Sequence, residues 1–337
     1  MVPIPTQSNR DLGPPRPADH IPDSLRCQHE ACPASARTRR MTTFQSRLLA
    51  LPLACAVGFA GVLSAPLPAA AQNASSWLEP FPPFRIAPGL YYVGSRGLAS
   101  YLVTTSEGHI LINSNLEAGV PLIRASVEKL GFRFEEIRVL LISHSHFDHD
   151  AGSARIKELT GARYMVMEGD VATVESGGRT DFQYGADTAQ HYPPAKVDRV
   201  LRDGDEVRLG SAVLVARLTP GHTKGTTTWT MKVQEGGRNR DVVIIGSPNV
   251  NPGYKLVGNS AYPRIAEDFE KTFQVLKSLP VDYFLGAHGS YFDMERKITQ
   301  KGDARSPFID PEGYRAYVAD RERAFRAELT RQRRVNR

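Results

Sequence analysis

Three histidines and an aspartate stand within six residues of one another in this chain of 337 residues, in the segment His144-Ser-His146-Phe-Asp148-His149. The apolar run at 139–143 predicts a strand, so the polar segment falls on the loop at that strand's carboxyl end, where α/β scaffolds hold functional groups rigidly. Imidazole and carboxylate groups are typical metal ligands. The segment therefore predicts a metal site, and a solvated polar turn is the alternative.

Two further histidines occupy comparable positions. His222 lies in a tight turn, Pro-Gly-His222-Thr, between two predicted strands, and His288 follows another strand end in Gly-Ala-His288-Gly-Ser. Either one alone would be an ordinary loop histidine. Together with the first segment they place five histidines and one aspartate at strand ends. We interpret the remaining histidines of this part of the chain, His109 and His191, as non-ligands.

The elements that must position these groups alternate between strands and helices. Short β-branched runs predict strands at 90–93, 100–104, 109–113, 139–143, 163–167, 212–218, 226–233, 242–245 and 283–286. Helical spacing of apolar residues predicts helices at 121–130, 151–159 and 265–276. The pattern indicates a layered α/β fold in one large domain, residues 72–337.

The N-terminal part has a different character. Residues 1–40 are rich in proline and lack a periodic apolar pattern, so we expect a disordered, non-native extension that results from an early start-site assignment. Residues 41–71 combine flanking arginines, an apolar run at 48–63 and an Ala-Ala-Ala site before Gln72, which predicts a cleaved signal peptide that begins at Met41. An uncleaved membrane anchor is the alternative, although the run is short for a span.

Cleavage before Gln72 changes both the cysteine count and the charge. All three cysteines precede the cut, so the mature chain has no thiolate to offer a metal or a disulfide. The formal charge of +6 falls to +3, because seven basic and four acidic residues are removed. Acidic residues interleave with the arginines of 321–337, which we interpret as a solvated amphipathic helix, and we therefore expect no nucleic-acid partner.

The segment from His144 to His149 matches the His-x-His-x-Asp-His signature of the metallo-β-lactamase superfamily, which the chain resembles from Trp77 to Ser290. The resemblance implies an αβ/βα sandwich: two facing β-sheets, helices on the outer faces, and a dinuclear metal site along one edge. It also implies that functional loops gather at that edge.

Several positions at which this chain differs from other branches of the superfamily indicate which branch it resembles. Flavodiiron-type relatives have Glu at the second ligand position, where this chain has His146. Glyoxalase-, lactonase- and RNA-processing-type relatives usually carry a bridging Asp after the strand at 242–245, and the first two lactamase subclasses supply Cys there, whereas this chain reads Ser247-Pro-Asn249. The chain is most similar to the third subclass of class B β-lactamases, and the phrases Glu175-Ser-Gly-Gly and Pro252-Gly-Tyr support this.

The resemblance assigns His144, His146 and His222 to one Zn²⁺ ion and Asp148, His149 and His288 to a second. Three protein ligands per ion leave a position open, as catalytic zinc sites require. The implied reaction is hydrolysis of the β-lactam amide by a metal-bound hydroxide whose parent water has a pKa of ~7. Asp148 is the expected catalytic residue, because its free oxygen would orient the hydroxide and later shuttle a proton.

Substrate recognition is expected near the metals. The family commonly has Ser-x-Ser where this chain has Ser247-Pro-Asn249, so we predict that Ser247 and Asn249 bind the antibiotic's carboxylate, with simple turn formation as the alternative. The loop at 176–194 should overhang the metals. Trp77 either lines the opposite rim or anchors the N-terminal tail.

The favoured function is a periplasmic or secreted dizinc β-lactamase that confers antibiotic resistance, acts on small-molecule β-lactams as a monomer and has no stable membrane insertion after signal cleavage. The alternative is a hydrolase of the same fold that acts on an ester, lactone or thioester. A non-catalytic zinc-binding exported protein is a third interpretation, which the open ligand sets disfavour because structural zinc sites are usually closed and rich in Cys.

Overall fold

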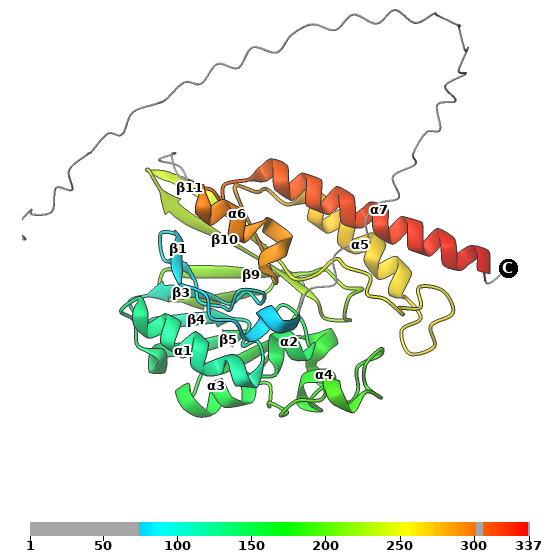
Figure 1. Cartoon of the computed structure of the whole chain (residues 1–337), viewed down its shortest axis with the longest axis horizontal. Coiled ribbons are helices and arrows are strands. Elements are labelled where there is room, and N and C mark those ends of the chain that lie inside the picture. Colours follow the sequence, from blue (N-terminus) through cyan, green and yellow to red (C-terminus); the bar gives the residue numbers. More distant parts are fainter. Residues whose placement is uncertain (1–73, 301–305, 336–337) are drawn as a thin grey trace, which may run out of the picture. The chain divides into compact units, whose positions relative to one another are not determined.

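Two β-sheets form the centre of the part of the chain that the computed structural model describes, residues 74–300 and 306–335. The predicted extension (1–40) and signal peptide (41–71) lie outside the described residues. The first sheet has strands β1 to β7 in chain order, and the second has the order β12-β11-β10-β9-β8 (Figure 1).

The first sheet changes from antiparallel to parallel halfway across. Its strands are β1 (Phe84–Ala87), β2 (Leu90–Tyr92), β3 (Tyr101–Thr105), β4 (Gly108–Ile112), β5 (Ile137–Leu141), β6 (Arg163–Met167) and β7 (Arg199–Leu201). Pairs up to β3–β4 are antiparallel, and pairs from β4–β5 onward are parallel. Along β5, Val139 and Leu141 belong to the core between the sheets while Leu140 packs on the opposite face, as the period of two requires.

The second sheet is antiparallel except for the pair β11–β12. Its strands are β8 (Glu206–Leu209), β9 (Ala212–Leu218), β10 (Thr227–Glu235), β11 (Arg238–Ile245) and β12 (Tyr283–Gly286). Gly236 and Gly237 both have positive φ and form the two-residue turn between β10 and β11. Residues 242–245 are wholly buried, which explains their continuous apolar sequence.

Helices cover the outer faces of both sheets (Figure 1). The α-helices are α1 (Val120–Lys129), α2 (Phe147–Asp150), α3 (Ser153–Thr160), α4 (Val171–Glu175), α5 (Ile265–Ser278), α6 (Met294–Thr299) and α7 (Pro311–Val335). Short 3-10 helices are η1 (Ala74–Leu78), η2 (Glu117–Gly119), η3 (Phe134–Glu136), η4 (Glu168–Asp170), η5 (Thr188–Gln190) and η6 (Gly289–Phe292). Helices α1 and α3 pack on the first sheet, and α5 and α7 lie on the side of the second. The predicted αβ/βα sandwich is confirmed.

Helix α7 is longer and more buried than the sequence predicts. The predicted amphipathic helix is present from 321 to 335, but it begins earlier, at Pro311, and one of its faces is buried rather than solvated. The buried residues of that face are Tyr314, Val318, Phe325, Leu329 and Gln332. Arginines on the outer face lie between these residues in the sequence, so the apolar spacing of the helix is hard to recognise there. No helix among the described residues is long and apolar enough to cross a membrane.

Candidate active site

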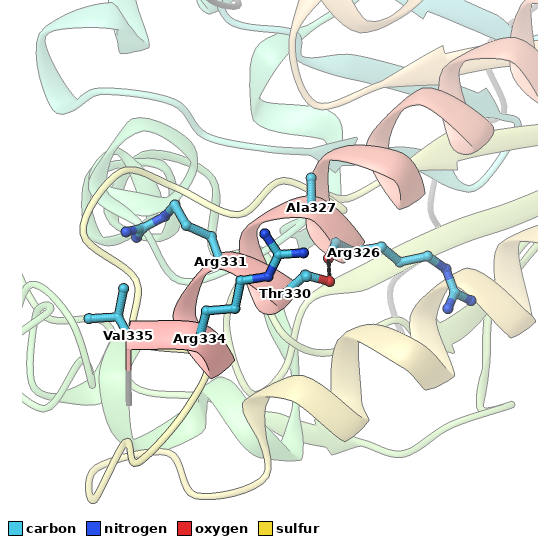
Figure 2. A pocket seen from close by; sticks show the side chains of 6 residues that line it. All are labelled: Arg326, Ala327, Thr330, Arg331, Arg334 and Val335. Carbon is cyan, nitrogen blue, oxygen red and sulfur yellow. Dashed lines mark hydrogen bonds between the residues drawn. The ribbon is translucent and has the colours of Figure 1, made fainter. Parts of the chain in front are cut away.

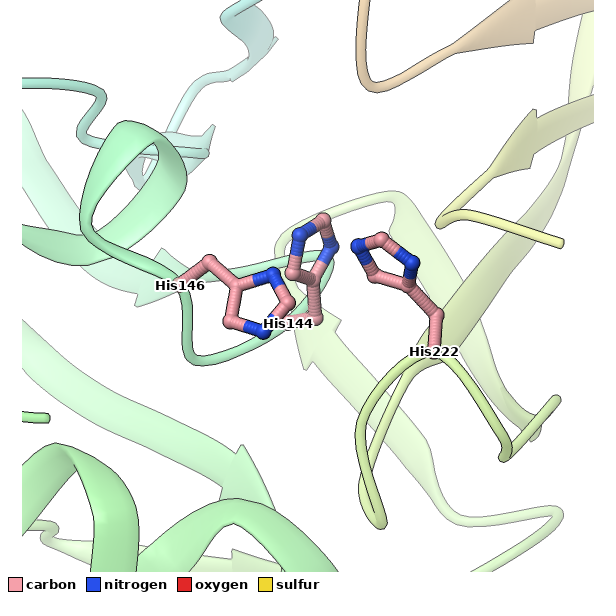
Figure 3. A group of neighbouring side chains, drawn as sticks. All are labelled: His144, His146 and His222. Atoms are coloured by element: carbon pink, nitrogen blue, oxygen red, sulfur yellow. The ribbon is translucent and has the colours of Figure 1, made fainter. Parts of the chain in front are cut away.

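Three of the predicted ligands form one cluster. His144 and His146 lie on the loop between β5 and α2, and His222 lies on the loop between β9 and β10. One ring nitrogen from each side chain lies within 4.8 Å of the others, and all three residues are buried. Figure 3 shows the three imidazoles turned toward a common space from two different loops. The arrangement can hold a metal ion.

The other three predicted ligands form a second cluster. Nε2 of His149 lies 3.1 Å from Nε2 of His288, and Oδ2 of Asp148 lies 3.3 Å from the first nitrogen and 3.4 Å from the second. Ligands placed 2.0–2.1 Å from a tetrahedral zinc ion are separated by roughly 3.3 Å, so this spacing suits such an ion. Ring centroids of His144 and His149 are 4.3 Å apart, which makes the two clusters neighbours.

Burial and neighbouring side chains set the protonation states of three of these groups, His222, His288 and Asp148. Burial lowers the pKa of both His222 and His288 to about 3, and nearby imidazoles add to the effect. Burial alone would raise the pKa of Asp148, but His149, His288 and His146 together hold that pKa below its usual range. At neutral pH the imidazoles of His222 and His288 are therefore neutral and the Asp148 carboxylate is ionised, as metal binding requires.

The loop that carries His144 is fixed by Asn113. This residue has a positive φ of 67°, and its side-chain oxygen accepts a hydrogen bond of 2.7 Å from the backbone N–H of Ser143. The backbone oxygen of Ser143 accepts a hydrogen bond of 2.8 Å from the N–H of Thr227 on β10. These contacts attach the end of β5 to the segment after β4 in its own sheet and to β10 in the second sheet, and they restrict the first ligand loop.

Asp170, at the end of η4, is a site residue that the sequence analysis missed. Its Oδ2 accepts hydrogen bonds from the N–H of Ser145 (2.9 Å) and the hydroxyl of Thr223 (2.7 Å), and its Oδ1 accepts one from the N–H of Gly225 (2.7 Å). A buried carboxylate thus joins the loop of His144 to the loop of His222. The only signal in the sequence was the position of Asp170 shortly after a predicted strand.

The ring of His222 is oriented by contacts behind it. Its Nδ1–H donates a hydrogen bond of 2.8 Å to the backbone oxygen of Asn249, which leaves the lone pair on Nε2, and the Tyr254 hydroxyl donates one of 2.8 Å to the His222 backbone oxygen. The preceding Gly221 has a φ of 125°, and a Cβ there would lie 2.7 Å from the ring of Phe269. Only glycine fits this turn without strain.

A cavity of about 1050 Å³ opens over both clusters. His146, Asp148, His222 and His288 line its floor. Tyr184 and Gln190, from the predicted overhanging loop at 176–194, line one side. The ring of Tyr184 lies 5.2 Å from that of His146.

Trp77 also lines this cavity, where its ring lies 5.7 Å from Phe147 and 6.4 Å from His288. It therefore takes the rim position that was one of its two predicted roles. His109 and His191 lie outside both clusters: His109 contacts Phe132, and the ring of His191 bonds the backbone oxygen of Gly185.

Ser247 and Asn249 differ in their access to the cavity. Asn249 lines it, whereas Ser247 is only 1% exposed and is not among the lining residues. Both contact Tyr291, which the sequence analysis missed: the Asn249 amide donates a bond of 2.7 Å to the Tyr291 hydroxyl, and the Ser247 hydroxyl lies 3.2 Å from it. Tyr291 also lines the cavity.

Comparison with known proteins defines the family. A family model described as the metallo-beta-lactamase superfamily matches residues 96–288, more than half of the chain. The chain belongs to this superfamily. The buried clusters of histidine and aspartate at one edge of an αβ/βα sandwich fit a metal-dependent hydrolase.

Solved structures support a closer relationship. The native FEZ-1 metallo-β-lactamase from Legionella gormanii is 53% identical with a TM-score of 0.74, and the match covers 76% of this chain and 98% of that one. BJP-1, a subclass B3 metallo-β-lactamase of Bradyrhizobium japonicum, is 33% identical with a TM-score of 0.73, and the match covers 78% of this chain and 99% of that one. The predicted resemblance to the third subclass of class B is confirmed.

Curated relatives point to a different substrate over a shorter stretch. A hydroxyacylglutathione hydrolase from Methylobacterium sp. (strain 4-46) is 32% identical over 110 residues, which are 33% of this chain. The match spans only about a third of the relative's own length (35%).

Proposed function

We propose that this protein is a dizinc β-lactamase that hydrolyses the amide bond of β-lactam antibiotics. The observation that carries the proposal is the pair of adjacent ligand clusters, made of five histidines and Asp148, four of which line one cavity. The chain's similarity to FEZ-1 over nearly the whole of that enzyme supports it. His144, His146 and His222 would hold one ion, and Asp148, His149 and His288 the other.

Zinc at these positions would acidify a water molecule and polarise the substrate carbonyl. The side chains have defined tasks around that chemistry. Asp148 lines the cavity and is held as a carboxylate by His149 and His288, so it can orient the attacking water, take a proton from it and return that proton to the leaving ring nitrogen. Tyr184 and Trp77 line the same cavity beside His146 and His288.

A thioester, ester or lactone hydrolase is the second candidate, because the curated relatives are named hydroxyacylglutathione hydrolases. The segment after β11 argues against it. Relatives of that type usually place a metal-bridging Asp there, and this chain has Ser247-Pro-Asn249. Among the described residues, the donor clusters consist of histidines and Asp148 alone.

The test is hydrolysis of a chromogenic cephalosporin and of a carbapenem by protein that begins at Gln72. We expect turnover that a chelator abolishes and that added zinc restores. Absence of β-lactam turnover by folded protein containing two zinc ions, together with turnover of a thioester such as an acylglutathione, would establish the second candidate instead.

We further propose that residues 41–71 direct export and that the mature enzyme is periplasmic or secreted, where it confers resistance. The predicted signal pattern before Gln72 supports this proposal. Expression of the chain from Met41 should give a protein whose first residue is Gln72 in the periplasmic or culture fraction, and a raised inhibitory concentration of a β-lactam. An uncut, membrane-bound product would contradict it.

A further inference from the structure

We propose that Arg321, on helix α7, binds the carboxylate that β-lactam substrates carry beside the ring nitrogen. This inference rests on the proposed function and adds a specificity-determining residue to it. Arg321 lines the same cavity as the two donor clusters. It lies far from the clusters in sequence, on the part of α7 that lines the cavity together with Ala324, Glu328 and Arg331.

From the sequence we predict that Ser247 and Asn249 bind the substrate carboxylate. In the structure both side chains contact Tyr291. The Asn249 amide N–H₂ donates to the Tyr291 hydroxyl at 2.7 Å, and Ser247 lies beneath the cavity wall. The Asn249 side-chain oxygen faces Arg321, with Nη1 at 3.5 Å. On this side Asn249 therefore presents an acceptor, which cannot bind an anion. The Arg321 guanidinium, by contrast, is a hydrogen-bond donor.

Aromatic packing fixes the guanidinium at this position. Its carbon lies 5.8 Å from the centre of the Tyr317 ring, and Tyr317 stacks on Tyr291 with 5.2 Å between ring centres. Tyr291 in turn lies 5.0 Å from the ring of His288. Asn249, which contacts Arg321, is also bonded to the first cluster, because the Nδ1–H of His222 donates a hydrogen bond of 2.8 Å to its backbone oxygen. Arg321 is therefore connected to the second cluster through Tyr317 and Tyr291, and to the first cluster through Asn249.

Arg321 shares its counter-ion, Asp320, with a second cation. Its Nε and Nη2 bond the carboxylate of Asp320, and Nη1 points to Asn249. Asp320 also accepts a bond of 3.0 Å from Arg323, so that one carboxylate is shared by two guanidinium groups. Of the described residues that line the cavity, only Arg321 and Arg331 carry a permanent positive charge, and Arg331 is paired with Glu328 at 2.6 Å.

A second cationic hollow lies along the last turns of α7, lined by Arg326, Ala327, Thr330, Arg331, Arg334 and Val335 (Figure 2). It has a different character. The side chains of Arg326 and Arg331 are 65% and 64% exposed and are paired with Glu322 and Glu328. Solvent screens the charge of such exposed arginines, whereas the Arg321 side chain is 26% exposed. This hollow also contains neither donor cluster. The comparison favours Arg321.

The test compares a cephalosporin that has a free carboxylate with its methyl ester, using zinc-loaded wild type, R321Q, R321K and R323Q. For R321Q we expect KM for the free acid to rise about tenfold, the loss of one charge-assisted hydrogen bond, with kcat within about twofold. KM for the ester should change less than about twofold. R321K should recover part of the affinity for the acid.

R323Q is the matched control, because Arg323 shares Asp320 with Arg321 but is 71% exposed and does not line the cavity. It should leave both substrates unaffected. Thermal unfolding of each variant checks folding, and R321K serves if R321Q does not fold. If the wild type is active and R321Q leaves KM for the free acid unchanged, or raises KM for acid and ester by the same factor, this inference alone is overturned. A wild type that holds two zinc ions but cuts neither substrate would overturn the proposed function and this inference with it.

Discussion

The carboxylate of Asp170 accepts a hydrogen bond of 2.7 Å from the hydroxyl of Thr223, and this contact joins the two loops that carry the first donor cluster. Thr223 directly follows His222. The same carboxylate oxygen accepts the N–H of Ser145, which lies between His144 and His146. The distance between histidines that lie far apart in sequence is therefore set by one buried side chain, which touches none of the ligand rings.

Asp170→Asn should loosen both loops. An amide keeps one acceptor oxygen and turns an N–H₂ group toward a donor, so at least one buried hydrogen bond is lost and one donor is left unpaired. We expect the free energy of unfolding to fall by about 2–4 kcal/mol. Zinc retention should fall with it, because His144, His146 and His222 lose their mutual register.

Urea unfolding and zinc content after dialysis measure the two effects of Asp170→Asn. Asp187→Asn is a matched control, because Asp187 caps the exposed helix η5 through the N–H of Ala189 and is not in the donor clusters. Unchanged stability and full zinc content in Asp170→Asn would show that the loops are held by other contacts.

The layered fold was readable from the sequence because its signals are local. Nine predicted strands correspond to β2 to β6 and β9 to β12, since each has a run of β-branched or aromatic residues. Strands β1, β7 and β8 are three or four residues long and include Arg85, Arg199 and Glu206, so their pairing depends on neighbours in the sheets. Edge strands of this kind carry little signal of their own.

The ligands of the candidate site were predictable for the same reason, because their signals are also local in the sequence. The spacing of His144, His146, Asp148 and His149 is local and was visible, and His222 and His288 stood out at strand ends. Asp170, Tyr291 and Arg321 were missed because their roles arise from contacts between segments far apart in the chain. An aspartate, a tyrosine and an arginine without a motif look ordinary in a sequence.

His222→Ala should remove one ligand from the first donor cluster. We expect the loss of about one zinc ion per chain and of most β-lactam turnover, because the cluster would keep only two imidazoles. His191→Ala is the control, since His191 bonds Gly185 and is outside the clusters. Zinc content and initial rates are the measurements. Two retained zinc ions and full activity in His222→Ala would show that the ligand assignment is wrong.

Gly221→Ala should strain the turn before His222. A Cβ there would lie 2.7 Å from the Phe269 ring, and the φ of 125° is unfavourable for alanine. We expect a loss of about 2–4 kcal/mol in the free energy of unfolding together with weaker zinc binding. Gly237→Ala separates the causes, because Gly237 has a φ of 74° but no atom within 4 Å of its Cβ position, so backbone strain alone should cost about 1 kcal/mol. Equal losses in the two variants would show that contact with Phe269 is unimportant.

The ion pair between Lys297 and Asp310 should make stability depend on pH. The Lys297 side chain is 2% exposed, and its Nζ lies 2.7 Å from Oδ2 of Asp310, whose Oδ1 accepts the N–H of Gly313 at the start of α7. Asp310→Asn keeps an acceptor for the Gly313 N–H but leaves the buried ammonium without its counter-ion, so we expect a loss of about 2–4 kcal/mol at pH 7.

The direction of that pH dependence follows from Asp310. Burial alone would raise its pKa, but Lys297 and the Gly313 N–H hold the pKa below its usual range. The stabilisation is therefore complete above the unfolded-state pKa of about 3.9 and is lost as pH falls through the lower folded-state value. Urea unfolding of wild type and Asp310→Asn should show a constant difference in the free energy of unfolding between about pH 5 and 7, and this difference should shrink below about pH 4.

Glu312→Gln is the control. It removes the exposed pair with Arg315 and should behave like wild type throughout. A difference that stays constant to pH 3 would mean that the charge of Asp310 does not stabilise the fold.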